Sequence, residues 1–513
     1  MKYFKASSVF LLLLLAACGY AQQNDFDMSN PIEFKETGWN KVLCMKNGNT
    51  MLFHFSPEKP ILVKVFDSTH KRVANQEHLC RIMDINVLRT SVFKGLFEIN
   101  NEAVLFIEQE HLGKQCLVRL CFNSNNGKLV DEKLVYTSRS LSKRTRFYVI
   151  KNKEQDDNYA ILFCTDEPQF YACDIHVVYY NKIHESIKER PIEVDRKKYD
   201  YVSVVGAESK SRGILISLNL MKMETNATVS RESPQRAIYD HQLATYYIPE
   251  DSNKVNRQIV DLSTDVFPYY SDYTYNPFAQ ALNLLMFSYK ELYYRFGIDV
   301  RRGTLTGDLF FKIAEDNSDI TFNWIKNDSV TSALQRKTDT TKIFYGVPLG
   351  MFTNENGLTT LVTQGYERYD EPETAARYNF DSYYGNIGIT QLDDDGNELW
   401  GTMLPLSEYY KSYRHYYHPK EIAKKNQTHI MFDDLPEQIA DRQFVSLNTY
   451  TYQKNLYIIF NDDNRNFNKT TSDAMGDTIF SFENTNACYY KQYQFFFTKQ
   501  KPRHNARAFF CFF

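Results

Sequence analysis

The stretch AVLFIE at residues 103–108 is one of seven short apolar runs that decide the fold. The others are MLFHF at 51–55, YAILF at 159–163, GILISL at 213–218, LNLLMF at 282–287, LTTLVT at 358–363 and LYIIF at 456–460. Each run follows a polar or glycine turn and precedes a second, alternating run. The starts at 51, 103, 159 and 213 are 52, 56 and 54 residues apart, and later starts are separated by 69, 76 and 98. The sequence therefore contains a repeated β unit.

A unit of this length accommodates four strands of about five or six residues and hairpin loops of about two to five. One such sheet cannot bury both of its faces, so several must stack, and radial stacking of four-stranded sheets gives a β-propeller. We expect an all-β fold, a β-propeller of about seven four-stranded blades. Two β-sandwich-like domains are the alternative, because the number of strands does not separate the two folds.

Turn chemistry and composition agree with the hairpins of this fold. Four dipeptides supply the positive backbone torsions of tight hairpin turns, Asn47-Gly48, Asn126-Gly127, Asn356-Gly357 and Asp395-Gly396. The chain has 37 Tyr and 37 Phe but 3 Trp, a balance that favours strands. The longer late intervals are expected to contain insertions at 224–235 and 416–442.

The N-terminus predicts export. Lys2 and Lys5 precede an apolar run from Val9 to Ala17 that ends in Leu15-Ala16-Ala17-Cys18, which is typical of a lipoprotein signal. Lipid on the Cys18 thiol would anchor the protein to a membrane. A competing cleavage after Ala21 would discard Cys18 and give a periplasmic or secreted protein. The expected location is the outer membrane or the cell surface.

The sequence divides into four expected parts. They are a lipoprotein-type signal peptide at 1–21, a polar tether at 22–36, the propeller at 37–497 and an irregular or truncated tail at 498–513. The tail is separated because 499–507 is basic and 509–513 reads FFCFF, an apolar end that does not fit the strand pattern. No segment after the signal approaches the roughly 20 apolar residues of a membrane helix.

One region resembles a known group of sequences. It comprises Asn386–Trp400 (NIGITQLDDDGNELW) with Pro405, and Leu456–Asn464 (LYIIFNDDN) with Asn468. It resembles the strand, D-x-x-G turn and following strands of uncharacterised exported β-propeller-like proteins, including lipoproteins, of Bacteroidota. The resemblance covers roughly residues 340–470 and implies a fold and an envelope location without an activity.

Cysteine spacing gives one candidate bridge and no metal motif. Setting Cys18 aside, eight cysteines remain and none form a CxxC pair, which argues against zinc or thioredoxin-like sites. Cys164 and Cys173 flank Asp166-Glu167-Pro168-Gln169, so a disulfide across a hairpin is predicted. The remaining cysteines fit buried small hydrophobic positions.

Candidate metal and catalytic residues are weak, so no metal, cofactor or catalytic residue is assigned. Asp393, Asp394, Asp395, Asn397 and Glu398 have calcium-type oxygens, but the twelfth position from Asp393 is Leu404 rather than Glu, and a hairpin turn explains them. Pro419 disfavours a helix that would pair His415 with His418. His184-Glu185 lacks the second histidine of a zinc protease motif.

Tyrosine-rich segments give the positive indication of binding. Their residues are Tyr269, Tyr270, Tyr273 and Tyr275, with further clusters at 366–369, 383–384 and 409–413. We expected these segments to be loops whose rings bind a protein or stack on a glycan. With 60 basic against 63 acidic residues and a net charge of -3, nucleic acid is not an expected partner. The expected function is a non-enzymatic binding module, and the alternative is a glycoside hydrolase-like propeller enzyme.

Overall fold

The second strand of each of the first six sheets determines the fold, because both of its faces are buried. In the computed structural model, β6 (Glu102–His111) directs Ala103 and Leu105 toward one neighbouring sheet and Val104 and Phe106 toward the other. A strand covered on both faces needs apolar residues at consecutive positions rather than at alternate ones. This is why the runs in the sequence are continuous.

The structure describes residues 39–290, 304–412, 447–462, 486–489 and 507–512, apart from short connecting segments within these ranges. The signal, the tether and Cys18 lie outside the described residues, as do His415, His418 and most of both expected insertions. No helix in the described part is long and apolar enough to cross a membrane.

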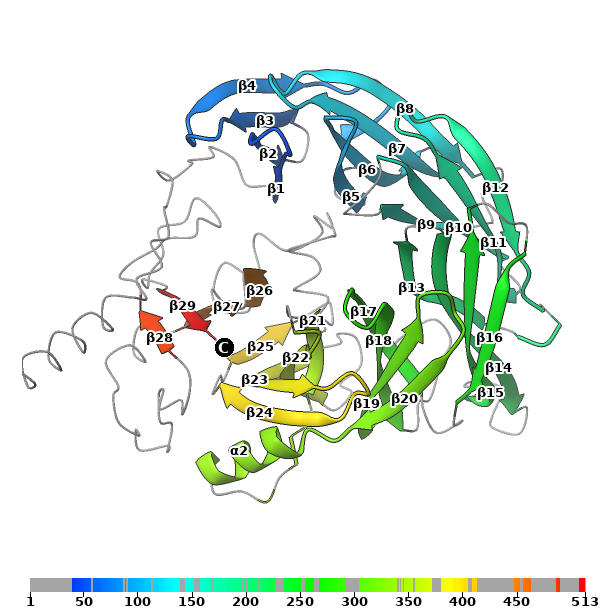
Figure 1. Ribbon diagram of the computed structural model, residues 1–513, viewed down its shortest axis with the longest axis vertical. Helices are drawn as coiled ribbons and strands as arrows, with labels where there is room; N and C mark the ends of the chain where they lie inside the picture. Colours follow the sequence, from blue (N-terminus) through cyan, green and yellow to red (C-terminus); the bar gives the residue numbers. More distant parts are fainter. Residues whose placement is uncertain are drawn as a thin grey trace, which may run out of the picture. The chain divides into compact units, whose positions relative to one another are not determined.

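The first four blades contain sixteen strands (Figure 1). They are β1 (Trp39–Cys44), β2 (Thr50–Phe55), β3 (Ile61–Phe66) and β4 (Arg72–His78) in blade 1; β5 (Val92–Ile99), β6, β7 (Lys114–Asn123) and β8 (Leu129–Thr137) in blade 2; β9 (Arg144–Lys151), β10 (Tyr159–Glu167), β11 (Phe170–Tyr180) and β12 (Ser186–Ile192) in blade 3; and β13 (Tyr201–Lys210), β14 (Gly213–Asn226), β15 (Gln235–Pro249) and β16 (Asn256–Asp261) in blade 4.

The other three blades contain the remaining strands. They are β17 (Phe267–Asn276), β18 (Ala281–Lys290), β19 (Thr304–Ala314) and β20 (Ile320–Ile325) in blade 5; β21 (Gly346–Thr353), β22 (Thr359–Asp370), β23 (Phe380–Leu392), β24 (Glu398–Leu404) and the added β25 (Glu408–Ser412) in blade 6; and β26 (Leu447–Tyr452), β27 (Asn455–Asp462), β28 (Asn486–Tyr489) and β29 (Arg507–Phe512) in blade 7. One helix, α2 (Asp328–Thr338), lies between β20 and β21.

The protein is an all-β propeller, as the repeat predicts. In blades 1 to 6 the four main strands pair in chain order, from β1-β2-β3-β4 to β21-β22-β23-β24. Blades 3 and 4 are joined into one eight-stranded sheet by a single parallel pair, Tyr171 with Tyr201. The propeller is confirmed over the alternative of two sandwiches.

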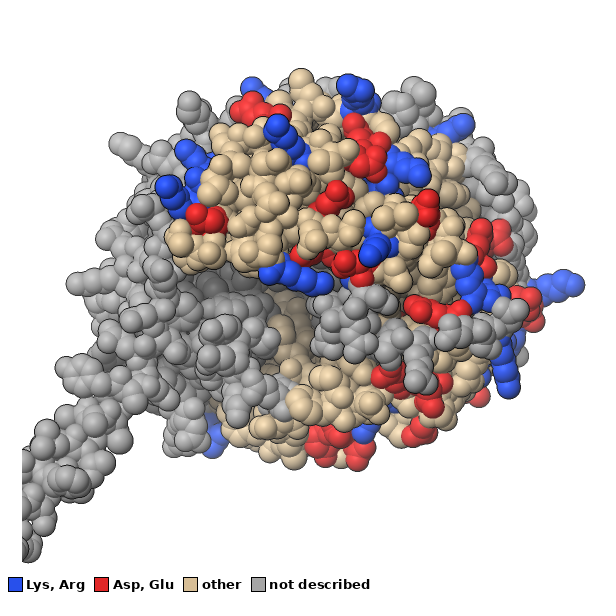
Figure 2. Space-filling view, turned by 45° about the horizontal axis from the view of Figure 1, so that its top comes forward, with Lys and Arg blue, Asp and Glu red and all other residues tan. Residues whose placement is uncertain are grey.

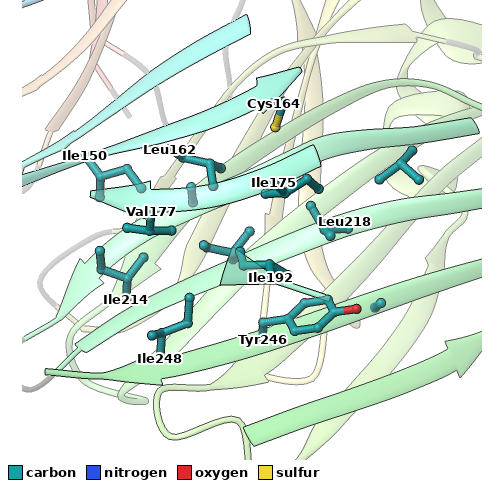
Figure 3. Packing of buried hydrophobic residues seen from close by; sticks show 14 of the residues in the cluster. Ile150, Leu162, Cys164, Ile175, Val177, Ile192, Ile214, Leu218, Tyr246 and Ile248 are labelled. Atoms are coloured by element: carbon teal, nitrogen blue, oxygen red, sulfur yellow. The ribbon is translucent and has the colours of Figure 1, made fainter. Parts of the chain in front are cut away.

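Apolar cores join each of the first five blades to the next. Blades 1 and 2 share a core that contains Phe53 and Leu105, and blades 2 and 3 share one that contains Phe106 and Phe163. Figure 3 shows the core between blades 3 and 4, where Leu162 and Val177 of blade 3 pack with residues of blade 4. Two further cores link blades 4 and 5 and blades 5 and 6. The cores therefore lie between sheets, and each of blades 1 to 6 buries its faces against a neighbouring blade.

The last blade differs from the expectation of an irregular C-terminal tail. Its strand order is β26-β27-β29-β28, so residues 507–512 form the strand between β27 and β28. Phe509, Phe510 and Phe512 belong to this run, and aromatic residues favour strands. The sequence pattern missed the strand because β29 pairs out of chain order.

The turns between the third and fourth strands, here called outer turns, share one geometry in four blades. A residue with positive φ closes each of them: His70 (59°), His184 (67°), Asn317 (58°) and Gly396 (79°). Its N–H donates to the carbonyl three residues earlier, as from Gly396 to Asp393 at 3.1 Å. Positive φ favours Gly and Asn, so a histidine at this position has a conformational cost.

The acidic segment 393–398 is such a turn, and two of its carboxylates accept backbone N–H groups. Asp393 Oδ1 accepts from the N–H of Asp395 at 2.9 Å and of Asn397 at 2.8 Å. The Glu398 carboxylate accepts from the N–H groups of Asp328 at 2.8 Å and Ser329 at 2.6 Å, at the start of α2. Glu398 therefore caps a helix N-terminus, where a negative charge is stabilising.

Candidate functional site

A cluster of polar side chains is buried between blades 2 and 3, next to the outer turns. It contains Glu102 at the start of β6, Cys121 near the end of β7 and His184 in the outer turn of blade 3. The ligand atoms of these three residues all lie within 4.8 Å of one another. Cys121 is fully buried and His184 is 9% exposed. Three hairpins thus bring sulfur, nitrogen and oxygen donors together.

Backbone turns set the positions of two of these residues. Glu102 follows Asn100 and Asn101, whose φ values of 52° and 61° are those of a tight primed hairpin turn. His184 has a φ of 67°, and its N–H donates to the carbonyl of Asn181 at 2.9 Å. The Asn181 side chain also accepts from the N–H of Glu185 at 2.9 Å. The histidine is therefore held in a closed turn rather than on a mobile loop.

Hydrogen bonds connect the cluster to Tyr159 and Arg119. The Cys121 Sγ lies 3.4 Å from His184 Nε2, and His184 Nδ1 lies 3.2 Å from the Tyr159 hydroxyl. Arg119 donates from Nη1 to the Tyr159 hydroxyl at 3.4 Å and from Nη2 to Asp131 Oδ2 at 2.7 Å. Both nitrogens of the histidine ring thus have defined neighbours.

Burial keeps the unliganded cluster uncharged at Cys121 and His184. Burial raises the pKa of the Cys121 thiol to about 12, and the Glu102 and Asp131 carboxylates add to this. Burial, with Arg119 nearby, lowers the pKa of His184 to about 4. Burial also raises the pKa of Glu102, and Asp131 contributes. A neutral thiol beside a neutral imidazole is a poor nucleophile, so the geometry does not favour Cys–His hydrolysis.

The predicted tyrosines of 269–275 lie in strand β17 rather than in a loop. Tyr273 is 39% exposed, and its ring faces the backbone of Gly206 on β13. The Tyr275 hydroxyl donates to Glu315 Oε2 at 2.6 Å, which gives it a structural bond. Tyr269 and Tyr270 belong to the same strand, but their side chains lie outside the described residues. Tyr273 and Tyr275 are two positions apart on this strand and therefore share a face of the sheet, and each has a contact within the fold.

The other predicted tyrosine clusters come together in blade 6. β22 and β23 extend beyond the body of the blade, and β25 pairs with the extended part of β23. The register places Tyr366 opposite Tyr384 and Tyr383 opposite Tyr409. Directly opposite positions share a face of the sheet and consecutive positions alternate, so positions 366 and 384 lie on one face of these strands and positions 383 and 409 on the other. We call the segments 366–370, 380–384 and 408–412 the tyrosine extension.

The predicted Cys164–Cys173 disulfide stays a prediction, and the strand register counts against it. Cys164 lies opposite Ile175, and Asp166 lies opposite Cys173. The two cysteines are therefore diagonal neighbours, whose Cα atoms are typically about 7–8 Å apart. A disulfide normally joins Cα atoms closer than about 7 Å.

No protein-family model and no curated protein matches the sequence. Solved structures that match include the WD40 domain of SCAP from fission yeast, with 7% identity, 94% of this chain and 96% of that chain covered, and a TM-score of 0.28. A protein of unknown function from Bacteroides caccae has 10% identity and a TM-score of 0.26, and the match covers 67% of this chain and 89% of that chain. The GH43 endo-arabinanase of Bacillus licheniformis has 9% identity and a TM-score of 0.25, and the match covers 55% of this chain and 97% of that chain. At these values no function is transferred to this chain.

Sequence reasoning missed the Glu102, Cys121 and His184 cluster. His184-Glu185 was considered only as part of a local motif, and Cys121 only as a buried hydrophobic residue. The three residues are 19 and 63 positions apart, and no metal motif has this spacing. The positive φ that marks His184 is visible only in the structure.

Proposed function

We propose that this protein is an exported, lipid-anchored propeller that binds a glycan or a protein through the tyrosine extension of blade 6. The supporting observation is the register that pairs Tyr366 with Tyr384 and Tyr383 with Tyr409. Tyrosine combines a flat apolar ring with a polar tip, which suits sugar rings and protein surfaces. The resemblance to exported propeller-like proteins of Bacteroidota supports the envelope location.

Charge distribution is compatible with such a partner. Figure 2 shows acidic and basic side chains interspersed over the described part of one face, without a large area of one sign. Binding through aromatic rings and hydrogen bonds does not depend on a strong field, whereas nucleic-acid binding does. The proposed ligand is a glycan or a protein surface.

The binding proposal predicts that Tyr383→Ala with Tyr409→Ala weakens ligand binding at least about tenfold, because each ring supplies contact area that alanine lacks. The measurement is calorimetric titration of the mature full chain with a panel of polysaccharides, with crosslinking to envelope proteins as the second arm. Trp324→Ala is the matched control, because this exposed aromatic residue lies on β20 of blade 5 and is 37% exposed. It should bind as the parent does.

Two results would contradict this proposal. Equal binding by the double tyrosine variant would place the ligand elsewhere on the molecule. Release of reducing sugars from a bound polysaccharide would instead support the carbohydrate-active enzyme, which requires two suitably spaced carboxylates.

The anchor proposal predicts that the mature protein begins at Cys18 and carries acyl chains. Mass spectrometry of the mature N-terminus checks this directly. We expect Cys18→Ser to move the protein from the membrane fraction to the soluble fraction, because two acyl chains supply the membrane affinity. A mature N-terminus at Gln22 would show that the competing cleavage site is used.

A further inference from the structure

We propose that Glu102, Cys121 and His184 bind one zinc-class divalent metal ion between blades 2 and 3. This inference is independent of the proposed ligand binding, because it concerns a different part of the molecule and rests on different residues. The three ligands would be Cys121 Sγ, His184 Nε2 and a Glu102 carboxylate oxygen. Three protein ligands would leave one coordination position for water or for another donor.

The distances suit tetrahedral coordination. With a metal–sulfur bond of about 2.3 Å and a metal–nitrogen bond of about 2.0 Å, tetrahedral geometry separates the two ligand atoms by about 3.5 Å. The observed separation of Cys121 Sγ and His184 Nε2 is 3.4 Å. All three ligand atoms lie within 4.8 Å of one another, so the Glu102 carboxylate would have to move closer to the other two to complete the set. Thiolate, imidazole and carboxylate are the ligands that zinc uses in proteins.

Surrounding residues orient the histidine for a metal at Nε2. A histidine that binds metal through one nitrogen usually donates from the other to a neighbouring acceptor. His184 Nδ1 has such a neighbour in the Tyr159 hydroxyl, at 3.2 Å. The Tyr159 ring stacks on Tyr180, with centroids 5.0 Å apart and an interplanar angle of 7°. The acceptor for the histidine is therefore fixed by packing.

Charge balance favours a dication. A divalent ion, the Cys121 thiolate and the Glu102 carboxylate sum to zero. Of the other nearby charges, Arg119 and Asp131 neutralise one another through a contact of 2.7 Å, and Lys133 adds one positive charge. An uncompensated charge is costly in a buried site, and the metal with its two anionic ligands has none. Binding would release the Cys121 thiol proton to solvent as the metal–sulfur bond forms, so binding should weaken at low pH.

The backbone holds the imidazole of His184 in place. The residue occupies the outer-turn position with positive φ, as Gly396 does in blade 6, Asn317 in blade 5 and the exposed His70 in blade 1, so this conformation belongs to the turn. Glu102 is only partly buried, so an ion would reach the three ligands from its side.

The test uses the mature full chain, stripped with EDTA and then equilibrated with Zn²⁺ at neutral pH. We expect one zinc per chain by plasma mass spectrometry after desalting, and a loss of affinity of at least about 100-fold in Cys121→Ser. Cys116→Ser is the matched control, because this residue is on the same strand, is 4% exposed and donates to the Gln109 carbonyl. The control should retain one zinc per chain.

Two further measurements separate metal binding from loss of structure. His184→Asn removes the imidazole but keeps a residue that tolerates positive φ, so it should fold and lose zinc. Co²⁺ should give a thiolate-to-metal charge-transfer band in the parent and in Cys116→Ser, and no such band in Cys121→Ser. Absence of zinc binding by the parent, or equal zinc binding by the folded His184→Asn protein, would overturn the proposal and leave a hydrogen-bonded cluster only.

Discussion

Phe122→Ala is expected to destabilise the protein by about 3–5 kcal/mol, the usual cost of removing a large aromatic side chain from a core. Phe122 lies on β7 and is fully buried in the core between blades 1 and 2. Its ring meets Phe53 edge to face at 5.2 Å and His78 at 5.5 Å. Truncation removes both contacts and leaves a cavity between two sheets that cannot close without moving a blade. Urea unfolding followed by circular dichroism measures the change.

Phe278→Ala is the matched control for this truncation. Phe278 follows β17 and is 60% exposed, so its removal should change the free energy of unfolding by less than about 1 kcal/mol. The Phe122 variant should also expose blade 1 to proteolysis before the other blades, because its cavity lies on that side. A loss below about 1 kcal/mol for Phe122→Ala would show that the core between blades 1 and 2 does not hold them together.

Asn317→Ala is expected to destabilise the protein by about 2–4 kcal/mol through two separable effects. Asn317 is fully buried in the outer turn of blade 5, with a φ of 58°. Its Nδ2 donates to the carbonyls of Thr245 and Asn256 at 3.2 Å each, and its Oδ1 accepts from the Thr245 hydroxyl at 2.5 Å. Alanine removes these bonds to blade 4 and also disfavours the positive φ.

Asn317→Gly separates the two effects. Glycine accepts the positive φ but makes none of the side-chain hydrogen bonds. The Asn317→Gly protein should therefore be more stable than the Asn317→Ala protein by about 1 kcal/mol and less stable than the parent. His70→Gly is the control at the matching position of blade 1, where φ is 59° and the side chain is exposed. We expect no loss of stability there. Equal melting temperatures for Asn317→Gly and the parent would show that the bonds to blade 4 contribute nothing.

The fold could be predicted from the sequence because the patterns that specify it, apolar runs and hairpin-turn dipeptides, are local and recur along the chain. Runs such as AVLFI at 103–107 are apolar at every position, and a strand that is covered on both faces requires this. Dipeptides such as Asn126-Gly127 marked hairpin turns, and Gly127 has a φ of 68° in the structure. Blade 7 was harder to predict, since the pairing of β29 between β27 and β28 does not follow chain order.

The candidate sites depend on contacts that the sequence does not encode locally. The tyrosines at 366–369, 383–384 and 409–413 were recognised as a group, but we expected loops and the structure has strands. The alternation of these tyrosines with polar residues is compatible with a loop or a strand. Only the strand register of the structure shows which tyrosine positions lie opposite one another. The cluster of Glu102, Cys121 and His184 depends on how blades 2 and 3 pack, so spacing along the chain gives no signal for it.

Burial of both faces of the second strand in blades 1 to 6 has a practical consequence for anyone who divides the molecule into fragments. A cut between two blades, such as one between β8 and β9, would bare a sheet face lined by Phe106 and Leu117 on one piece and by Ile161 on the other. Such pieces should precipitate, since large apolar surfaces drive self-association. A cut in an exposed outer turn, for example beside Asn125, exposes only polar residues at the new chain ends. Circularly permuted variants of the protein should therefore start at such a turn.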